Sequence, residues 1–483
     1  MHSLLLSSVL ITTLVHHVNA LSRRTPAHIA ITPNILPLKS VPYAHHLIPP
    51  SSLHLAYHRH HTNNNSTIHP RQSPFPTAPL QTPLLTLGGR IYITTITLSS
   101  QPFSVVLDTG SSDTWVASSS FQCLDPLSYA VIDTRYCWFN RTFDTRSSRT
   151  WREVEGWQFG VNYTGGEFLL GGLGWDVLGV GGDGEEEGGI GGGKGRLSVN
   201  QTVGVVESGV WVGDGISSGL MGLAYSALVS GAREFGYRSV MVSLTQATSQ
   251  PQIFSLALDR ATDGNPSSGG QLAIGGIPDV QHDGNWVTVP IQPIARDVYA
   301  YYAINIDGFD ITPPSSPSSQ SPSHQKREQS FLKRTWGLIT NWSSTTNPTK
   351  RSIISSPTLA ILDSGSSLLY LPDNIADHVA SLFSPPAVFN ANAGTWVVAC
   401  DAAAPRVGIV IDGQSFFISE DDLMNRGPGA VGGPGVGASQ GMCVLATQRA
   451  GGGSCVLGDS WLKGVLVVFD LEGNKVSVVG RSY

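Results

Sequence analysis

The sequence predicts an all-β protein built from two similar halves. Only 13% of its 483 residues are charged, whereas it holds 54 glycines and is rich in Ser, Thr and Val, which favours short strands joined by turns. Residues 105–116 and residues 359–369 repeat one pattern, an apolar run, an Asp, a hydroxyl residue, a glycine and two serines. We therefore expect a two-fold arrangement in which Asp108 and Asp363 face each other.

The first 20 residues have the pattern of a secretory signal peptide. An apolar run over residues 4–15 is followed by Val18-Asn19-Ala20, although no Lys or Arg precedes the run. A membrane anchor is the alternative, but the run is short for a span. Sequons fit an exported protein and occur at Asn64, Asn65, Asn140, Asn162, Asn200 and Asn341. We expect secretion or delivery to a vacuole, with no membrane-embedded part.

Residues 21–83 differ from the rest of the chain in charge and composition. The first 71 residues hold five basic residues and no Asp or Glu, so the net charge of −6 leaves −11 on the remainder. Eight histidines lie here: His28, His45, His46, His54, His58, His60, His61 and His69. Metal binding at residues 58–61 is disfavoured because Cys and carboxylate ligands are missing. We interpret residues 21–83 as an unstructured or removable prosegment that binds the acidic body rather than nucleic acid.

The body divides into residues 84–250 and residues 251–483. Alternating residues 91–98 predict a half-buried strand, and the latter half of the glycine-dense residues 171–195 predicts a flexible insertion. A Pro/Ser-rich insertion, residues 312–351, contains three Lys-Arg pairs. These pairs indicate either a solvated basic loop or sites for a dibasic-specific processing protease.

Five cysteines in an exported chain predict two disulfides and one free thiol. Fifteen such arrangements exist, and proximity favours Cys123 with Cys137 and Cys400 with Cys443. Cys455 lies in an apolar strand pattern, where an inert buried thiol is expected.

The two aspartates are the candidate catalytic groups. Two carboxyls within hydrogen-bonding distance share one proton, so one can act as general base on water and the other as general acid. This chemistry requires no metal and no cofactor. Gly110 and Gly365 can bring backbone N–H groups close to the carboxylates, and Thr109 and Ser364 can lock the two loops together.

The next residues, Ser111 and Ser366, can donate to the carboxylates directly. With these residues the two stretches, Asp-Thr-Gly-Ser at 108–111 and Asp-Ser-Gly-Ser at 363–366, resemble the signatures of pepsin-like aspartic endopeptidases. Residues 220–222, 456–459 and 465–480 are similar to later parts of that family. The resemblance covers about residues 84–483 and implies two β-rich lobes, an interdomain cleft and a flap hairpin over it.

The resemblance also implies substrate-binding residues on the flap. Residues 158–167 occupy its place, Tyr163 matches the flap tyrosine, and Trp115 matches the tryptophan that bonds its hydroxyl. Gly165 and Gly166 follow in a Tyr-Thr-Gly-Gly order, where the family has Tyr-Gly-Thr-Gly. A glycan on Asn162 would lie beside the flap tip.

These observations predict an acid endopeptidase that is made as a zymogen, acts on polypeptides and works as a monomer. The prosegment is expected to inhibit at neutral pH and to leave or be cut at acidic pH. A catalytically silent pepsin-like protein that binds a partner in the same cleft is the alternative. A glycosylated structural surface protein would leave the repeated Asp stretches unexplained.

Overall fold

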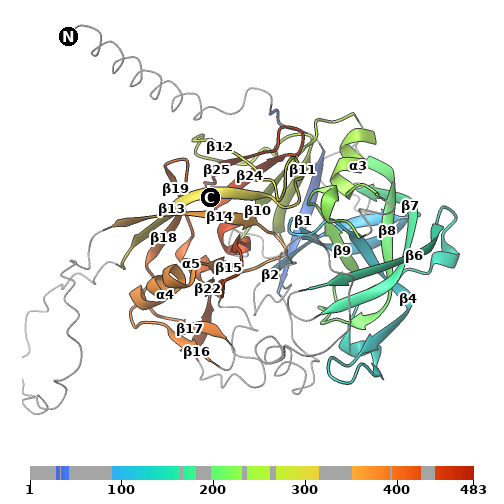
Figure 1. The fold of residues 1–483 in the computed structure, drawn as a ribbon, viewed down its shortest axis with the longest axis horizontal. Coiled ribbons are helices and arrows are strands. Elements are labelled where there is room, and N and C mark those ends of the chain that lie inside the picture. The colour runs from blue at the N-terminus through green and yellow to red at the C-terminus, as the bar shows by residue number, and fades with distance from the viewer. Residues whose placement is uncertain are drawn as a thin grey trace, which may run out of the picture.

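The computed structural model consists mainly of three β-sheets arranged as two lobes (Figure 1). A 14-stranded sheet runs through the first lobe and into the second in the order β12-β25-β24-β10-β11-β1-β2-β3-β9-β4-β8-β7-β6, with β5 paired to β4. Its strands are β1 (Ile35–Pro42), β2 (Arg90–Leu98), β3 (Gln101–Asp108), β4 (Thr114–Leu124), β5 (Val131–Ile132), β6 (Arg152–Asn162), β7 (Phe168–Val180), β8 (Leu197–Val210), β9 (Gly219–Gly222), β10 (Ile253–Leu258), β11 (Ser268–Ile274), β12 (Val287–Pro290), β24 (Val465–Asp470) and β25 (Lys475–Gly480).

The second lobe holds the other two sheets. The seven-stranded sheet has the order β19-β18-β13-β14-β23-β15-β22, and the four-stranded sheet has the order β16-β17-β21-β20. Their strands are β13 (Ala303–Thr312), β14 (Ser352–Leu362), β15 (Leu369–Leu371), β16 (Val388–Asn390), β17 (Thr395–Ala399), β18 (Arg406–Ile411), β19 (Gln414–Phe417), β20 (Met424–Asn425), β21 (Met442–Leu445), β22 (Thr447–Arg449) and β23 (Cys455–Leu457).

The helices of the described residues are short (Figure 1). They are α3 (Val240–Ala247), α4 (Asp373–Leu382), α5 (Glu420–Leu423) and α6 (Asp459–Leu462), with 3₁₀ turns η1 (Thr134–Tyr136), η2 (Thr145–Ser147) and η3 (Ser226–Leu228). In α4, Ile375, Ala376, Val379 and Ala380 form one buried face. No helix in the described part of the chain is long and apolar enough to span a membrane.

The structure describes residues 29–32, 34–42, 90–163, 167–180, 197–230, 236–247, 249–260, 268–314, 351–391, 394–425 and 441–482. Several sequence predictions therefore fall outside the described residues. They concern the signal peptide, most of the prosegment with its histidines, the glycine-rich insertion after β7, and most of the insertion between β13 and β14.

Strand β1 corrects one expectation. Residues 35–42 of the presumed prosegment are not unstructured, because β1 pairs antiparallel with both β2 and β11 and lies inside the large sheet. Leu36 and Leu38 are each 3% exposed, and the Thr32 hydroxyl donates to the carbonyl of Ile274 at 3.0 Å. The alternation is too short, and too interrupted by Pro37, to predict a strand from sequence.

The two halves repeat one strand arrangement around each aspartate. In the first lobe β3 pairs parallel with β9, which also pairs antiparallel with β4. In the second lobe β14 pairs parallel with β23, which pairs antiparallel with β15. Residues 220–222 and 456–457, which lie in stretches that resemble the family, therefore belong to the strands that run beside each Asp loop.

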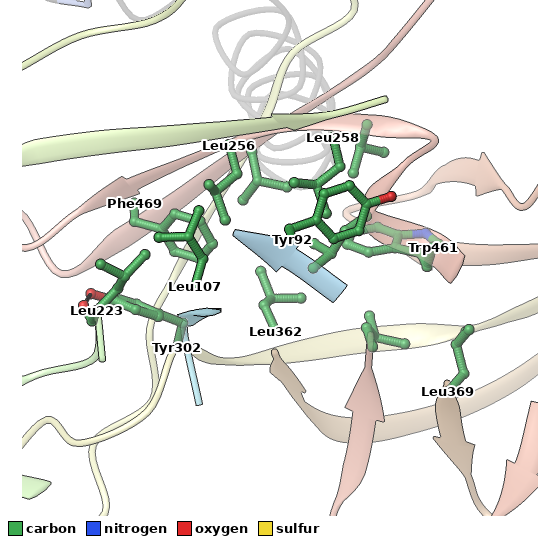
Figure 2. Close-up of a cluster of buried hydrophobic side chains, with 14 of the residues drawn as sticks. Tyr92, Leu107, Leu223, Leu256, Leu258, Tyr302, Leu362, Leu369, Trp461 and Phe469 are labelled. Carbon is green, nitrogen blue, oxygen red and sulfur yellow. Dashed lines mark hydrogen bonds between the residues drawn. The ribbon is translucent and has the colours of Figure 1, made fainter. Parts of the chain in front are cut away.

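A continuous apolar core lies where the lobes meet (Figure 2). Side chains from both halves contribute to it, including Leu107 and Leu362, which immediately precede the two loops and are both 0% exposed. Burying side chains of this kind contributes about 1.5–3 kcal/mol each. The strand ends that carry the aspartates are thus fixed by packing on both sides of the junction.

Candidate active site

The two aspartates sit at the ends of buried strands. Asp108 is the last residue of β3 and Asp363 follows the last residue of β14, and they are 5% and 1% exposed. In each case the β-branched, apolar run of the sequence forms a central strand, and the following Gly lets the chain turn. The structure brings these two residues together although they are far apart in the sequence.

The hydroxyls of Thr109 and Ser364 lock the two loops to each other. Thr109 Oγ1 donates to the carbonyl of Leu362 at 2.9 Å and accepts the N–H of Ser364 at 2.8 Å. Ser364 Oγ donates to the carbonyl of Leu107 at 3.1 Å and accepts the N–H of Thr109 at 3.2 Å. These four buried hydrogen bonds repeat about the two-fold axis and hold the loops in register.

The carboxyl groups are in direct contact. Asp108 and Asp363 share a side-chain hydrogen bond, while the N–H of Gly110 donates to Asp108 at 2.7 Å and the N–H of Gly365 donates to Asp363 at 2.8 Å. A Cβ on Gly110 would lie 2.6 Å from Asp363 Oδ1, and one on Gly365 would lie 2.6 Å from Asp108 Oδ1. Only glycine leaves room for the opposite carboxylate at these positions.

The two serines that follow behave differently. Ser111 Oγ donates to Asp108 Oδ2 at 2.5 Å, as the sequence suggested. Ser366 Oγ instead donates to the carbonyl of Leu368 at 3.2 Å, so the expectation that it donates to Asp363 is wrong. The carbonyl of Ser366 accepts the N–H of Asp459, which is distant in the sequence, and the hydroxyl closes the turn toward Leu368.

Burial dominates the electrostatics of Asp108. It raises the pKa of Asp108 above its usual value, against the lowering effect of hydrogen bonds from Ser111, Gly110 and Asp363. A carboxyl with a raised pKa beside a second carboxyl can retain a proton under conditions in which isolated carboxyls lose theirs. The arrangement can therefore hold one proton between the two carboxyl groups.

The predicted flap tyrosine lies against the predicted tryptophan. Trp115 Nε1 donates to the Tyr163 hydroxyl at 2.8 Å, and both side chains are buried. Trp211 extends this aromatic wall, with ring centroids 5.1 Å from Trp115 and 5.7 Å from Tyr163. Gly165 and Gly166 lie outside the described residues.

Sequence reasoning missed four polar residues near the site. Tyr301 lies close enough for the charges of Asp363 and Asp108 to act, after burial, to raise its pKa. Asp113, Glu167 and Asp459 are buried carboxyls whose pKa values burial raises. Asp113 and Asp459 lie next to sequence stretches that resemble the family. A single polar residue does not form a periodic pattern, so the sequence gives no sign that its side chain is buried.

Both expected disulfides are present in the structure. Cys123 bonds to Cys137 and Cys400 bonds to Cys443, while Cys455 is a buried free thiol. Burial raises the pKa of Cys455 to about 12, which makes it a poor nucleophile. Among the residues that the structure describes, no three His, Cys, Asp or Glu side chains come together as metal ligands.

Comparison with known proteins identifies the class. The family described as eukaryotic aspartyl protease matches residues 91–325 and 329–480, and the chain belongs to this family. It is thus an aspartic-type endopeptidase with the bilobal pepsin-like fold.

Several curated relatives are fungal proteins. A probable aspartic-type endopeptidase of Aspergillus fumigatus is 31% identical over 394 residues, covering 79% of this chain and 76% of the relative. The probable aspartic-type endopeptidase opsB of the same species is 24% identical over 408 residues, covering 81% and 69%. Secreted aspartic protease 8 of Candida albicans is 23% identical over 407 residues, covering 84% and 79%.

Proposed function

We propose that the protein hydrolyses peptide bonds at acidic pH by activating a water molecule between Asp108 and Asp363. The contact between the two carboxyls, each also held by a backbone N–H, is the observation that carries this proposal. The ionised carboxyl takes a proton from water as the water attacks the peptide carbonyl carbon, and the protonated carboxyl donates to the carbonyl oxygen. The roles then reverse, and a proton passes to the leaving amine.

Tyr163 and Trp115 support substrate binding in this proposal. Their hydrogen bond holds the tyrosine over the aromatic wall, so that an extended polypeptide can lie between this wall and the aspartates. We propose polypeptide substrates, and we expect the protein to act as a monomer.

The test is digestion of an acid-denatured protein substrate at acidic pH. Activity that a transition-state mimic of the aspartic class abolishes, and that Asp108→Asn removes, supports the proposal. Intact folded protein that binds the mimic but cuts no substrate would overturn it and favour a silent binding protein.

Residues 21–83 act as an inhibitory prosegment in this account. The part that the structure describes is tied in by the two ladders of β1 and by buried leucines, which supports a segment held firmly on the body. Acidification neutralises body carboxylates and charges the prosegment histidines, so we expect release or self-cleavage. A purified precursor that keeps its mass and stays inactive throughout an acid titration would contradict this.

Export through the secretory pathway fits two further observations. Two disulfides suit an oxidising compartment, and the relatives include a secreted protease. We expect the protein in the culture medium or the vacuole, without residues 1–20. Mass spectrometry of the recovered protein gives its N-terminus, and a retained leader would contradict export by this route.

The contacts of Arg351 limit which Lys-Arg pair of the insertion, residues 312–351, a processing protease would cleave. Its guanidinium donates to Asp310 at 2.5–3.1 Å, and Asp310 is 0% exposed and also accepts from Ser415. The Asp310 carboxylate is buried, whereas the Arg351 side chain is 58% exposed, so removing the cation would take charged donors from a buried carboxylate. A cut after Arg351 would free this cation from β14, so we propose that any dibasic cleavage follows Arg327 or Arg334. New N-termini at Glu328 or Thr335 support this, and one at Ser352 contradicts it.

A further inference from the structure

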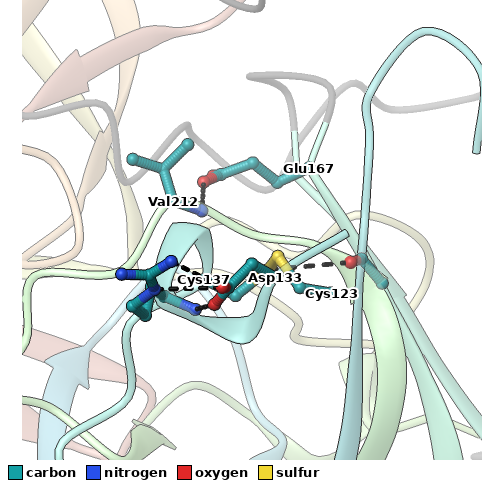
Figure 3. The surroundings of a disulfide bond; sticks show 7 residues. Cys123, Asp133, Cys137, Glu167 and Val212 are labelled. Atoms are coloured by element: carbon teal, nitrogen blue, oxygen red, sulfur yellow. Dashed lines mark hydrogen bonds and ion pairs between the residues drawn. A yellow bond between two sulfur atoms is a disulfide. The ribbon is translucent and has the colours of Figure 1, made fainter. Parts of the chain in front are cut away.

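Glu167 is a buried carboxyl at the base of the flap. It lies just before β7, is 6% exposed, and its carbonyl accepts the N–H of Tyr163 at 2.8 Å. Its Oε1 accepts the N–H of Val212 at 3.0 Å (Figure 3). Its Oε2 is fully buried and has no hydrogen-bond partner in the described part of the chain. Glu167 therefore joins the two ends of the flap loop to the segment that follows β8.

That segment carries the aromatic wall of the site. Val212 follows Trp211, whose ring packs on both Tyr163 and Trp115. The position of the Tyr163 ring thus depends on two connections that pass through Glu167, one to its own backbone and one to the neighbour of Trp211. A substitution at Glu167 would therefore change the position of the Tyr163 hydroxyl, even though Glu167 does not need to contact the aspartate pair.

We propose that Glu167 is a positioning residue for Tyr163. While its side chain is uncharged it stays buried against Val212, and its backbone carbonyl then holds Tyr163 in place; ionisation would draw the carboxylate toward water and release Tyr163, so that Glu167 limits activity at neutral pH. The inference rests on the proposed function of Asp108 and Asp363. The ionised form of buried Glu167 would place a charge on Oε2, for which the residues described in the structure supply no donor.

The surrounding charges do not compensate an ionised Glu167. Asp108 and Asp113, on the active-site loop, act with Glu167 on the same Tyr163 phenol. Beyond Val212, Asp214 accepts the N–H groups of Ile216 and Ser217. On the disulfide loop drawn in Figure 3, Arg135 is exposed and donates to Asp133.

Burial therefore has the largest effect on Glu167. It raises the pKa of Glu167 to about 7, and the hydrogen bond from Val212 opposes it only in part. The carboxyl remains protonated at acidic pH and ionises as the pH approaches neutral. The flap therefore contains a carboxyl group, that of Glu167, which titrates separately from the aspartate pair.

The first test is made in catalytically inactive Asp108→Asn protein, so that neither autolysis nor the proposed reaction affects the result. With carboxyl-¹³C glutamate, we expect one resonance to titrate near pH 7 and to disappear in Glu167→Gln. The matched control, Glu155→Gln on the same hairpin, is exposed and should keep it. If every glutamate resonance titrates below about pH 5.5, the proposal is overturned, even where Glu167→Gln does not fold.

The second test uses the active enzyme. Above the pKa of Glu167, the protonated fraction falls about tenfold for each pH unit, so at pH 8 about one molecule in ten keeps Glu167 protonated. Glutamine at this position does not titrate. The loss of kcat/KM between pH 5 and pH 8 should therefore be about tenfold smaller in Glu167→Gln than in Glu155→Gln. Equal losses in the two variants would contradict the positioning role. Absence of activity in every variant would instead count against the proposed function, while the carboxyl titration would still stand.

Discussion

The loop that carries Asp108 and the loop that carries Asp363 share a backbone framework but not their side-chain surroundings. In both loops the Asp lies at the end of a strand, and the glycine two residues later donates its N–H to the Asp carboxyl. The hydroxyl of the residue between them donates to a backbone carbonyl of the other loop. In the first loop Ser111 donates to its carboxylate, whereas in the second Ser366 faces the protein backbone.

The positions further along differ as well. Asp113 accepts from Ser230 and Tyr237, and Ser230 Oγ also lies 3.2 Å from the carbonyl of Gly160 on the flap strand. The equivalent position in the second loop is Leu368, a buried apolar residue. Two carboxyls in matched positions but unlike surroundings acquire different proton affinities, which is the condition for one to act as acid and the other as base.

The largest expected effect comes from the aspartates themselves. Asp108→Asn and Asp363→Asn should each reduce kcat by roughly 10³-fold or more, because each removes one partner of a single acid–base unit. The double variant should be no worse than either single variant. Rates on a fluorogenic peptide measure this, and an active single variant would show that the two loops are not chemically coupled.

The next effect concerns the shared framework. Thr109→Val and Ser364→Ala each leave buried backbone groups without partners, so each should lower the free energy of unfolding by about 2–4 kcal/mol. Denaturant melts in the Asp108→Asn background measure this, with exposed Ser119→Ala as the control. Strongly unequal losses would mean that the hydroxyl network is not symmetric in energy.

A third effect sharpens the contrast between the lobes at acidic and neutral pH. The strand beside each Asp loop is followed by a residue after a glycine, which is Leu223 after Gly222 in the first lobe and Asp459 after Gly458 in the second. Burial raises the pKa of Asp459 well above its usual value. The folded state then binds a proton that the unfolded chain, with a carboxyl pKa of about 3.9, releases. The free energy of unfolding should therefore fall as the pH rises above about 4.

Asp459→Asn never ionises, so its stability curve should be flatter and should approach that of the parent near pH 4. Thermal melts from pH 3.5 to pH 7 measure this, beside exposed Asp279→Asn. Parallel curves for Asp459→Asn and the parent would show that Asp459 does not titrate with folding.

The smallest effect isolates the two serines. The Ser111 hydroxyl lowers the pKa of Asp108, so Ser111→Ala should move the acid limb of the kcat/KM profile up by at most about one pH unit. Ser366→Ala should leave that limb in place, since its hydroxyl donates to a carbonyl. Similar displacements in both variants would remove the distinction between the loops.

The sequence alone was sufficient to predict the features that both halves of the chain repeat. Repetition of the Asp-hydroxyl-Gly-Ser pattern predicted the pairing of Asp108 with Asp363 and the cross-lock by Thr109 and Ser364, because these depend on local chain geometry repeated in both halves. The resemblance supplied the contact between Trp115 and Tyr163.

Features that depend on tertiary surroundings could not be predicted. Strand β1 forms because two distant strands offer it unpaired edges, which its own residues do not reveal. The orientation of Ser366 follows from the approach of Asp459, and the burial of Glu167 follows from the position of Val212. Each is set by a partner more than forty residues away.

The dependence of kcat/KM on pH, measured for the matured wild-type enzyme from pH 2 to pH 8, tests the central claim most directly. Two carboxyls that hold one proton between them predict a bell-shaped curve with its maximum at acidic pH and little activity at pH 8. A rate that rises to a plateau at neutral pH would contradict shared-proton catalysis by Asp108 and Asp363.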